Sequence, residues 1–437
     1  MNKPVYIAYN WMGPEGPLEN ISSPDLYDLV SRENRDMISV DTLKSKTTQD
    51  DFGHRCVSNH EQFKMNGIAS MTQDDVFIYP ITLGWKDDMQ RLFNMENGIF
   101  ERNRVPQTFM DLIRHHKGYL VLEHGWESFC RWEDFDLIHR YVRYHNIPSN
   151  KTIYITGTAN VVTLYDEYCR ARNIDSRLTV IPYLPAQDGY AENISDVEMP
   201  EYDPWKMPSK TFLSLNYRPR PHRTMLLALF NKHHLLSKSY FSFCGMHDDQ
   251  HIGGTYNNSH IGGLDLDHSE VDGLQDRLAE FILDNNWPEQ YYDVIYDSGN
   301  KDMAKYYEDS LVNITTETNF YSDIISVTEK MFKPIRYMQP FVLVGAPYSL
   351  KHLKDLGFRT FEDFWDESYD LTVDHNQRLK KVMETCNQIS NFTHKETLEM
   401  RKLLQARLEY NFNLLKNLTQ SPVYQTLIDT VTLGNTI

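Results

Sequence analysis

The sequence has no long hydrophobic run. Its longest apolar stretches, such as TMLLALF and FVLVG, fall far short of the roughly 18 residues that a membrane-spanning helix requires. The first residues, MNKPVYIAYNW, begin a strand-like pattern at once and lack the apolar stretch and the cleavage site of a signal peptide. We therefore expect no membrane span and a cytoplasmic protein.

Cysteine is scarce, and its spacing suits neither a disulfide framework nor a zinc site. The five cysteines are scattered, odd in number, and form no CxxC pair or Cys/His zinc pattern. The segment 244–268 is rich in His, Asp and Gly, but its spacing fits no zinc or EF-hand site. We expect reduced thiols, no bound metal, and a flexible inserted loop at 244–268.

Basic residues are outnumbered, with 44 Lys and Arg against 61 Asp and Glu and a formal net charge of −17. A field of that sign repels polyanions, so we do not expect nucleic acid as a partner. Any bound phosphate must be held by a local cationic pocket. The 41% hydrophobic and 24% charged content is ordinary for a folded globular protein, and 437 residues suffice for roughly two or three domains.

Short apolar strands alternate with helical patterns in two stretches of the chain, residues 1–184 and 211–385. Between them, residues 185–210 are acidic, rich in proline and poor in periodicity, which is typical of a linker. Strands that alternate with helices indicate a parallel, doubly wound sheet. The pattern thus predicts an α/β protein with two lobes, in which ligands bind at the carboxyl ends of the strands. The strand-like segments lie at 5–10, 74–81, 119–124, 152–157, 178–184, 211–216, 240–245, 310–317 and 340–345.

The last part of the chain, residues 386–437, is predicted to be helical. Within it, 394–418 has the period of an amphipathic helix. Its expected apolar face consists of Met400, Leu403, Leu404, Leu408 and Leu415. The acidic run at 361–370 is most simply interpreted as a solvated face.

A cluster of cations surrounds the start of one predicted helix. Arg218, Arg220 and Arg223 follow the strand 211–216 in the sequence FLSLNYRPRPHRTMLLALF. A helix N-terminus carries roughly half a positive charge, so cations there are disfavoured unless a negative group lies nearby. A phosphate would be such a group, because helix amides and guanidinium groups both bind it. The alternative is a surface loop whose arginines pair with acidic side chains.

Glu329 and Lys330 stand side by side at the start of another predicted helix. Ser326 to Glu329 match a capping box, in which Glu329 would bond back to the amide of Ser326. That interpretation leaves Lys330 on the unfavourable end of the helix dipole, and Pro334 removes the amide that would bond the carbonyl of Lys330. A bound diphosphate and ribose would account for the lysine and the acid together.

The segment NITTETNFYSDIISVTEKMFKPIRYMQPFVLVGAP, residues 313–347, resembles the donor-binding segment of the α1,3/4-fucosyltransferases. It shares an acid-containing strand end, the T-E-K triplet, a helix, and a strand of the form P-[FV]-V-x-x-G. The resemblance covers about residues 210–385 and is specific within 311–370. It implies two Rossmann-like lobes of GT-B type with a cleft between them. Residues 1–184 would then be the acceptor-side lobe and 211–385 the nucleotide-sugar lobe.

The resemblance also implies an activity, which is inverting, metal-independent transfer of a sugar to a hydroxyl of a glycan. The family uses GDP-fucose, so the implied co-substrate is a nucleotide sugar and no cofactor is implied. Glu329 would lie near the ribose, Lys330 and Arg223 on the diphosphate, and Glu317 near the donor sugar. The other arginines of the 218–223 cluster would assist. The chain departs from the family in having Ser326 where an aromatic residue is usual, which leaves the donor sugar open.

Inversion requires a general base that takes the proton of the acceptor hydroxyl. The pair of acids seven residues apart that is typical of retaining enzymes is absent from this region. The strand at 119–124 ends with Glu123 and His124, where a ligand-facing base would lie. We rank Glu123 first and His124 second. In the alternative, both side chains are satisfied by the local backbone.

Two other functions are compatible with the residues. One is a transferase that adds a sugar to modified bases of DNA, which the acidic balance disfavours because such an enzyme needs a basic groove. The other is a binding module that holds a nucleotide or a glycan without turnover. The first predicts a salt-sensitive complex with duplex DNA, and the second predicts no hydrolysis of the donor.

Overall fold

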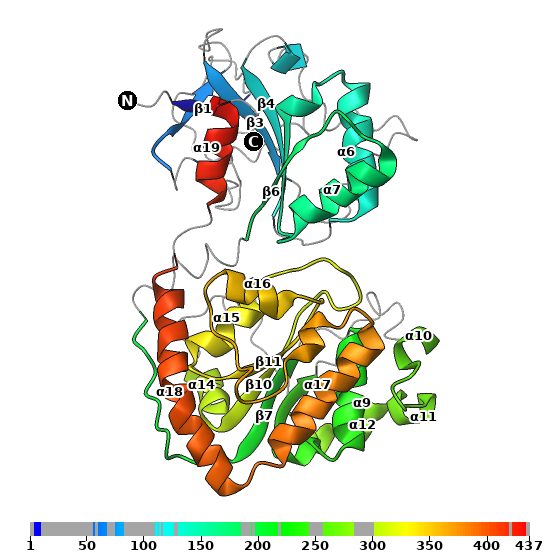
Figure 1. Cartoon of the computed structure of the whole chain (residues 1–437), viewed down its shortest axis with the longest axis vertical. Helices are drawn as coiled ribbons and strands as arrows, with labels where there is room; N and C mark the ends of the chain where they lie inside the picture. Colours follow the sequence, from blue (N-terminus) through cyan, green and yellow to red (C-terminus); the bar gives the residue numbers. More distant parts are fainter. Residues whose placement is uncertain are drawn as a thin grey trace, which may run out of the picture. The chain divides into compact units, whose positions relative to one another are not determined.

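A computed structural model of the chain divides it into two compact units (Figure 1). Unit 1 consists of residues 1–185 and 421–437, and unit 2 of residues 186–420. The structure describes residues 4–9, 56, 60–67, 75–82, 110–111, 113–114, 117–125, 130–184, 194, 197–216, 220–243, 257–283, 301–418 and 422–433. Each unit is built around its own parallel sheet, as the alternation of strands and helices predicts.

The sheet of unit 1 has the strand order β2-β1-β3-β4-β5-β6. Its strand pairs are all parallel in the described part of the unit. Along β4 and β5 nearly every side chain is buried, which is expected of a parallel sheet covered on both faces. The strands are β1 (Val5–Tyr9), β2 (Phe63–Gly67), β3 (Val76–Thr82), β4 (Gly118–His124), β5 (Thr152–Thr156) and β6 (Thr179–Pro182).

Helices from both ends of the sequence cover this sheet. Tyr154 of β5 packs against Phe135 of α6 (Trp132–Tyr144), beside α7 (Val161–Arg172). The neighbouring residues Ile153 and Ile155 point to the opposite face, where they share a core with α19 (Val423–Leu433). The last described helix of the chain thus completes the core of unit 1, and Figure 1 shows it beside β1. The predicted C-terminal segment 386–437 is therefore divided between the two units.

The sheet of unit 2 has the order β11-β10-β7-β8-β9, with parallel pairs throughout its described strands. The chain builds β7, β8 and β9 in one direction and then returns to add β10 and β11 on the other side of β7. The strand order therefore reverses between β7 and β10, and such a switch point is where open α/β sheets bind ligands. The strands are β7 (Lys210–Asn216), β8 (Ser239–Phe243), β9 (Ile282–Leu283), β10 (Ser310–Thr316) and β11 (Phe341–Val344).

The helices of unit 2 begin at residues that suit helix starts. Pro221 occupies the first position of α9, and the Asp374 carboxylate accepts a bond from the amide of Gln377 in α17. Thr393 and Glu396 form a capping box at α18. The helices are α9 (Pro221–Lys232), α10 (Asn258–Ile261), α11 (His268–Val271), α12 (Leu274–Arg277), α14 (Lys301–Glu308), α15 (Glu329–Arg336), α16 (Ser349–Asp355), α17 (His375–Ser390) and α18 (His394–Lys416).

Helix α18 packs on α15 and buries four of the five apolar residues expected on its face. The fifth, Leu403, is 70% exposed, so its prediction was wrong. Met400, Leu404 and Leu408 are four residues apart and share one stripe, whereas Leu403 lies off that stripe. The predicted linker also packs on this helix, because Tyr202 donates to the carbonyl of Arg401.

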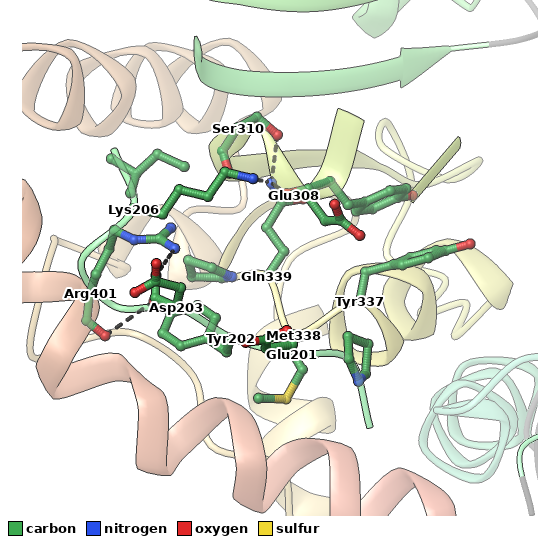
Figure 2. A pocket seen from close by; sticks show the side chains of 14 residues that line it. Glu201, Tyr202, Asp203, Lys206, Glu308, Ser310, Tyr337, Met338, Gln339 and Arg401 are labelled. Atoms are coloured by element: carbon green, nitrogen blue, oxygen red, sulfur yellow. Dashed lines mark hydrogen bonds between the residues drawn. The ribbon is translucent and has the colours of Figure 1, made fainter. Parts of the chain in front are cut away.

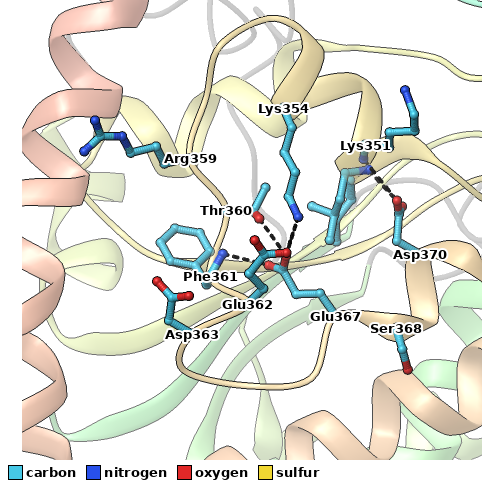
Figure 3. Close-up of polar contacts among 12 residues, drawn as sticks. Lys351, Lys354, Arg359, Thr360, Phe361, Glu362, Asp363, Glu367, Ser368 and Asp370 are labelled. Carbon is cyan, nitrogen blue, oxygen red and sulfur yellow. Dashed lines mark hydrogen bonds and ion pairs between the residues drawn. The ribbon is translucent and has the colours of Figure 1, made fainter.

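The acidic run at 361–370 is not simply a solvated face, because two of its acids are buried and hold the chain in place (Figure 3). Asp370 accepts the amides of Leu350 and Lys351 in the first turn of α16. Glu367 accepts the amide of Phe361, at 2.8 Å. Burial raises the pKa of both carboxyl groups. Some acids of this run therefore accept hydrogen bonds from the backbone, and others face the solvent.

Candidate functional site

The switch point of unit 2 joins the ends of two neighbouring strands. Thr316 closes β10 and donates its hydroxyl to the Asn216 side chain at the end of β7, at 2.6 Å. The Asn216 side chain in turn donates to the hydroxyl of Ser214, and the Asn216 backbone amide donates to the hydroxyl of Ser242. These buried polar contacts fix the carboxyl ends of β7 and β10 against each other.

The first turn of α9 is bonded to the end of β10. Arg223 donates Nη2–H to the carbonyl of Thr316 at 3.0 Å, and His222 donates Nε2–H to the carbonyl of Glu317 at 2.9 Å. Both side chains are buried. Burial and the adjacent charge of Arg223 lower the pKa of His222 well below its ordinary value, so this imidazole is neutral at pH 7. The helix start that carries the predicted cation cluster therefore lies at the switch point.

Of the other two arginines of that cluster, the structure describes Arg220. Arg220 is the N-cap residue of α9, is half-buried, and bonds through its carbonyl to the amides of Arg223 and Thr224. Arg218 lies outside the described residues. The structure thus brings Arg223, with Arg220 one turn earlier, to the site.

Glu317 follows β10 directly and is buried at the base of the site. Thr328 Oγ1 lies 2.7 and 2.9 Å from its two carboxylate oxygens. Gly345, after β11, lies beside this side chain, since a Cβ atom at Gly345 would be 3.5 Å from Glu317 Cβ, an ordinary contact distance. Burial raises the pKa of Glu317, and the charge of Lys330 opposes that rise.

The start of α15 differs from the capping box predicted from the sequence. The N-cap residue is Thr328, whose hydroxyl accepts the amide of Lys330 at 3.3 Å. Ser326 lies before the helix and accepts a bond from the Asn319 side chain instead. The prediction of Ser326 as the cap was wrong, because Thr328 stands next to the helix and its hydroxyl also reaches Glu317. Glu329 is therefore not needed as a reciprocal cap.

Glu329 and Lys330 form an ion pair at this helix start, with Lys330 Nζ 2.7 Å from Glu329 Oε1 and 3.2 Å from Thr328 Oγ1. Burial by itself raises the pKa of Glu329, but the charges of Lys330 and Lys333 lower it to about 2. Burial lowers the pKa of Lys330, and the charges of Glu329 and Glu317 outweigh it and raise the pKa. Both groups are therefore charged at neutral pH.

The ion pair remains accessible, since the Lys330 side chain is 27% exposed and that of Glu329 is 14% exposed. The positive charge of Arg223 also acts on Lys330, which places the two cations of α9 and α15 in one electrostatic site. Two helix N-termini add further positive potential there. An anionic ligand with attached hydroxyl groups matches this arrangement, because the cations can bind the anion while Glu329 accepts hydroxyl hydrogens.

In unit 1 the predicted base candidates, Glu123 and His124, end β4 and are fully buried. Glu123 Oε1 accepts the amide of Gly125 at 2.7 Å, and His124 Nδ1 lies 3.4 Å from the hydroxyl of Tyr154. The glycine after this strand is required, since a Cβ atom there would come within 2.6 Å of the Tyr183 ring. Local backbone bonding of Glu123, the alternative considered from the sequence, is thus present.

Thr328, Thr316 and Asn216 connect the charged groups to the strand ends. Sequence reasoning noted Thr328 only as part of the T-E-K triplet, with no role of its own, and did not single out Thr316 or Asn216. A threonine immediately before an acid and a lysine at a helix start is the signal that could have identified Thr328. No group of His, Cys, Asp or Glu side chains that could hold a metal ion occurs in the described ranges. Among the same residues, no helix is long and apolar enough to cross a membrane.

No protein-family model matches the chain, and no curated protein matches it. Solved structures with a related arrangement include the alpha,alpha-trehalose 6-phosphate synthase of Burkholderia multivorans, at 11% identity and a TM-score of 0.39, covering 83% of this chain and 72% of that one. The UDP-forming alpha,alpha-trehalose-phosphate synthase of Burkholderia vietnamiensis has 11% sequence identity and a TM-score of 0.39, and the match covers 83% of this chain and 75% of that one. Apo UGT2 of Phytolacca americana has 9% sequence identity and a TM-score of 0.28, and the match covers 95% of this chain and 98% of that one.

Proposed function

We propose that this protein is a glycosyltransferase that uses a nucleotide-diphosphate sugar, bound at the switch point of unit 2. The observation that carries the proposal is the joint placement of Arg223, Glu317, Glu329 and Lys330 at the ends of β7 and β10. These residues come from two helix starts and one strand end, and the start of α9 lies about 90 residues or more before the other two in the sequence. Their types also match those implied by the resemblance of residues 313–347 to the fucosyltransferases.

In this proposal Lys330 and Arg223 neutralise the diphosphate, and the amides at the starts of α9 and α15 add to the positive potential. Glu329, ionised at neutral pH, accepts hydrogen bonds from the ribose hydroxyls. Glu317 lies behind Thr328 and positions the donor sugar. The Lys330 side chain is more exposed than the buried Arg223, so we expect Lys330 to contact the leaving diphosphate directly.

The transfer step breaks the bond between the anomeric carbon and the diphosphate oxygen, which leaves with the bonding electron pair. The acceptor hydroxyl attacks the opposite face of the sugar and gives its proton to a base, so the configuration inverts. Placed cations stabilise the charge that develops on the leaving group, and no metal is required for this role. Glu123, followed by His124, stays our prediction for the base, and a glycan hydroxyl stays our prediction for the acceptor.

The first experiment is a thermal-shift screen of the full chain against GDP-, UDP-, ADP-, CMP- and dTDP-sugars, because a ligand that binds the folded state raises its stability. GDP-fucose is the first donor to test, given the fucosyltransferase resemblance. Hydrolysis and transfer of each stabilising donor are then measured for the wild type and for Lys330→Ala and Arg223→Ala.

We expect Lys330→Ala to lower donor turnover by about 10²–10³-fold, the usual effect of removing one placed group that stabilises developing charge. Lys351→Ala is the matched control, since Lys351 is an exposed helix lysine paired with Asp355. Unchanged turnover in both Lys330→Ala and Arg223→Ala would contradict the proposal. A donor that binds without any hydrolysis at high protein concentration would identify a binding module instead.

A further inference from the structure

A second pocket lies in unit 2, at the edge of the sheet opposite to the switch point (Figure 2). It encloses a volume of ≈ 380 Å³, which falls within the range of about 300–1,000 Å³ for small-molecule pockets. Ser310, the first residue of β10, and Pro340, just before β11, line it, whereas Thr316 and Val344 end those strands at the other edge. Among the described residues predicted to bind the donor, none lines this pocket.

The pocket is built from segments that are distant in sequence. Residues 200–206, the end of α14, the turn after α15 and the middle of α18 all contribute. Gln339 fixes the wall, because its amide nitrogen donates to the carbonyls of Tyr307 and Ser310 and to the hydroxyl of Ser310. These bonds connect the turn after α15 to the start of β10. The wall is thus held by buried polar contacts rather than by a loose loop.

Aromatic rings form one side of the pocket. Tyr307 and Tyr337 stack on each other with ring centroids 4.2 Å apart and an interplanar angle of 19°. Tyr202 lies on another side, where the guanidinium carbon of Arg401 is 4.8 Å above its ring. Figure 2 shows Tyr337 and Tyr202 as separate parts of the lining. Aromatic faces of this kind bind the apolar face of a flat or ring-shaped ligand.

Charged side chains form the rest of the lining, and carboxylates predominate among them. Glu201, Asp203 and Glu308 supply three acceptors, against the two cations Lys206 and Arg401. The carboxylates of Glu201 and Glu308 belong to exposed residues, so ligand hydroxyls can reach them. A lining of this composition disfavours an aliphatic ligand, because polar groups would lose their water without replacement. It also disfavours a phosphate, because three negative charges face it.

Arg401 holds one wall of the same pocket. The residue is only 6% exposed, and its Nη2 donates to the carbonyl of Asp203 at 2.7 Å. This bond connects the middle of α18 to the segment 200–206. The wall that carries Tyr202 and Asp203 is therefore fixed to the helix by a buried polar contact.

We propose that this pocket binds a neutral, hydroxyl-rich ring, such as a single unit of a saccharide. The carboxylates of Glu201 and Glu308 would accept hydrogen bonds from its hydroxyl groups. Tyr337 would contact the apolar face of the ring. The pocket is separate from the proposed donor site and would hold a glycan by a second point of attachment.

The test is a titration of the full chain, without nucleotide, with methyl glycosides of neutral hexoses, 6-deoxyhexoses and N-acetylhexosamines up to millimolar concentration. Binding is followed by saturation-transfer NMR for the wild type and four variants. Glu308→Ala and Tyr337→Ala alter the pocket, Lys330→Ala alters the proposed donor site, and Glu399→Ala is an exposed acid of α18 outside the pocket. Thermal denaturation checks that each variant is folded.

We expect at least one glycoside to bind, with about tenfold weaker affinity in Glu308→Ala, the loss expected for one hydrogen bond to a charged group. Tyr337→Ala should also weaken binding by up to about tenfold, because it removes the aromatic contact. Lys330→Ala and Glu399→Ala should bind as the wild type does. The proposal is overturned if no glycoside binds, or if Glu308→Ala binds as tightly as the wild type. It is also overturned if Lys330→Ala weakens the binding and Glu308→Ala does not. Glu308 is exposed, so its variant stays informative even if Tyr337→Ala unfolds.

Discussion

A strand of each unit ends with an acid next to a second polar residue, yet the two ends are built differently. In unit 1, Glu123 and His124 are fully buried, and Glu123 bonds to the amide of Gly125 two residues away. In unit 2, the strand end at Glu317 is connected through Thr328 to Lys330, which is partly exposed. In the first arrangement the acid bonds to its own strand end, whereas in the second a partly exposed charge lies within reach of a ligand.

This difference shows that an acid at the end of a strand can serve two physical purposes. A buried carboxylate that accepts a nearby amide stabilises the local backbone, and its removal leaves that amide unsatisfied. A carboxylate within a network of cations instead sets their protonation and position. Both carboxylates are buried, so the distance in sequence to the bonding partner and the nearby cations distinguish the two cases. Glu123 bonds across two residues, and Glu317 across eleven.

The largest expected effect comes from Gly125, which follows β4. In Gly125→Ala the new methyl group would lie within 2.6 Å of the ring of Tyr183, which is buried. We expect the free energy of unfolding to fall by about 3 kcal/mol, the upper end of the usual cost of overpacking. Gly345→Ala is the matched change in unit 2, where the nearest atom is the Ser349 hydroxyl at 3.3 Å. Urea denaturation of both variants should show the larger loss in Gly125→Ala, and equal losses would contradict the comparison.

The next effect concerns the ion pair of unit 2. The pKa of Glu329 is lowered from 4.5 to about 2, so its ionised form stabilises the folded state above pH 4.5. That contribution is lost as the pH falls from about 4.5 to about 2. Glu329→Gln should therefore lower the free energy of unfolding by about 1–3 kcal/mol at pH 7. Denaturation curves at several pH values should show the difference from wild type shrinking in acid, and a constant difference would argue against this role.

A smaller effect is expected from His222, which connects α9 to β10. Its pKa is lowered in the folded state, so the unfolded chain binds a proton first as the pH falls below about 6.5. Below this pH the free energy of unfolding of the wild type therefore falls by up to about 1.4 kcal/mol for each pH unit. His222→Asn keeps a donor for the carbonyl of Glu317 but does not titrate. The stability gap between wild type and variant should narrow between pH 7 and pH 5, as followed by thermal unfolding.

Much of the fold could be predicted because parallel strands with two buried faces appear as short apolar runs. All nine predicted strands correspond to strands of the structure, including 152–157, where β5 is Thr152–Thr156. The strands β2 and β9 were missed. The sequence of β2, FKMNG, contains a lysine, an asparagine and a glycine, and β9 is only two residues long. Neither segment has the apolar run or the alternation that distinguishes a strand from a loop.

The candidate site was partly predictable for a different reason. Arg223 and Lys330 stand at helix starts, where cations are unfavourable, and this local conflict is visible in the sequence. The contacts that bring them together are not local: Arg223 bonds to Thr316, 93 residues later. The second pocket depends on Tyr202, Tyr337 and Arg401, whose proximity follows only from the packing of α18. No periodicity or motif in the sequence predicts that these three residues lie close together.

Helix α19 has a consequence for the order in which the protein can fold during synthesis. Its residues Tyr424 and Leu427 belong to the core of unit 1, although all 235 residues of unit 2, numbers 186–420, precede it. Unit 2 is continuous in sequence, so it can fold while the chain is still being extended. Ribosome-bound chains that stop before residue 423 should therefore resist protease in unit 2 and be cut in unit 1. The unit whose strands are made first is the unit whose core is completed last.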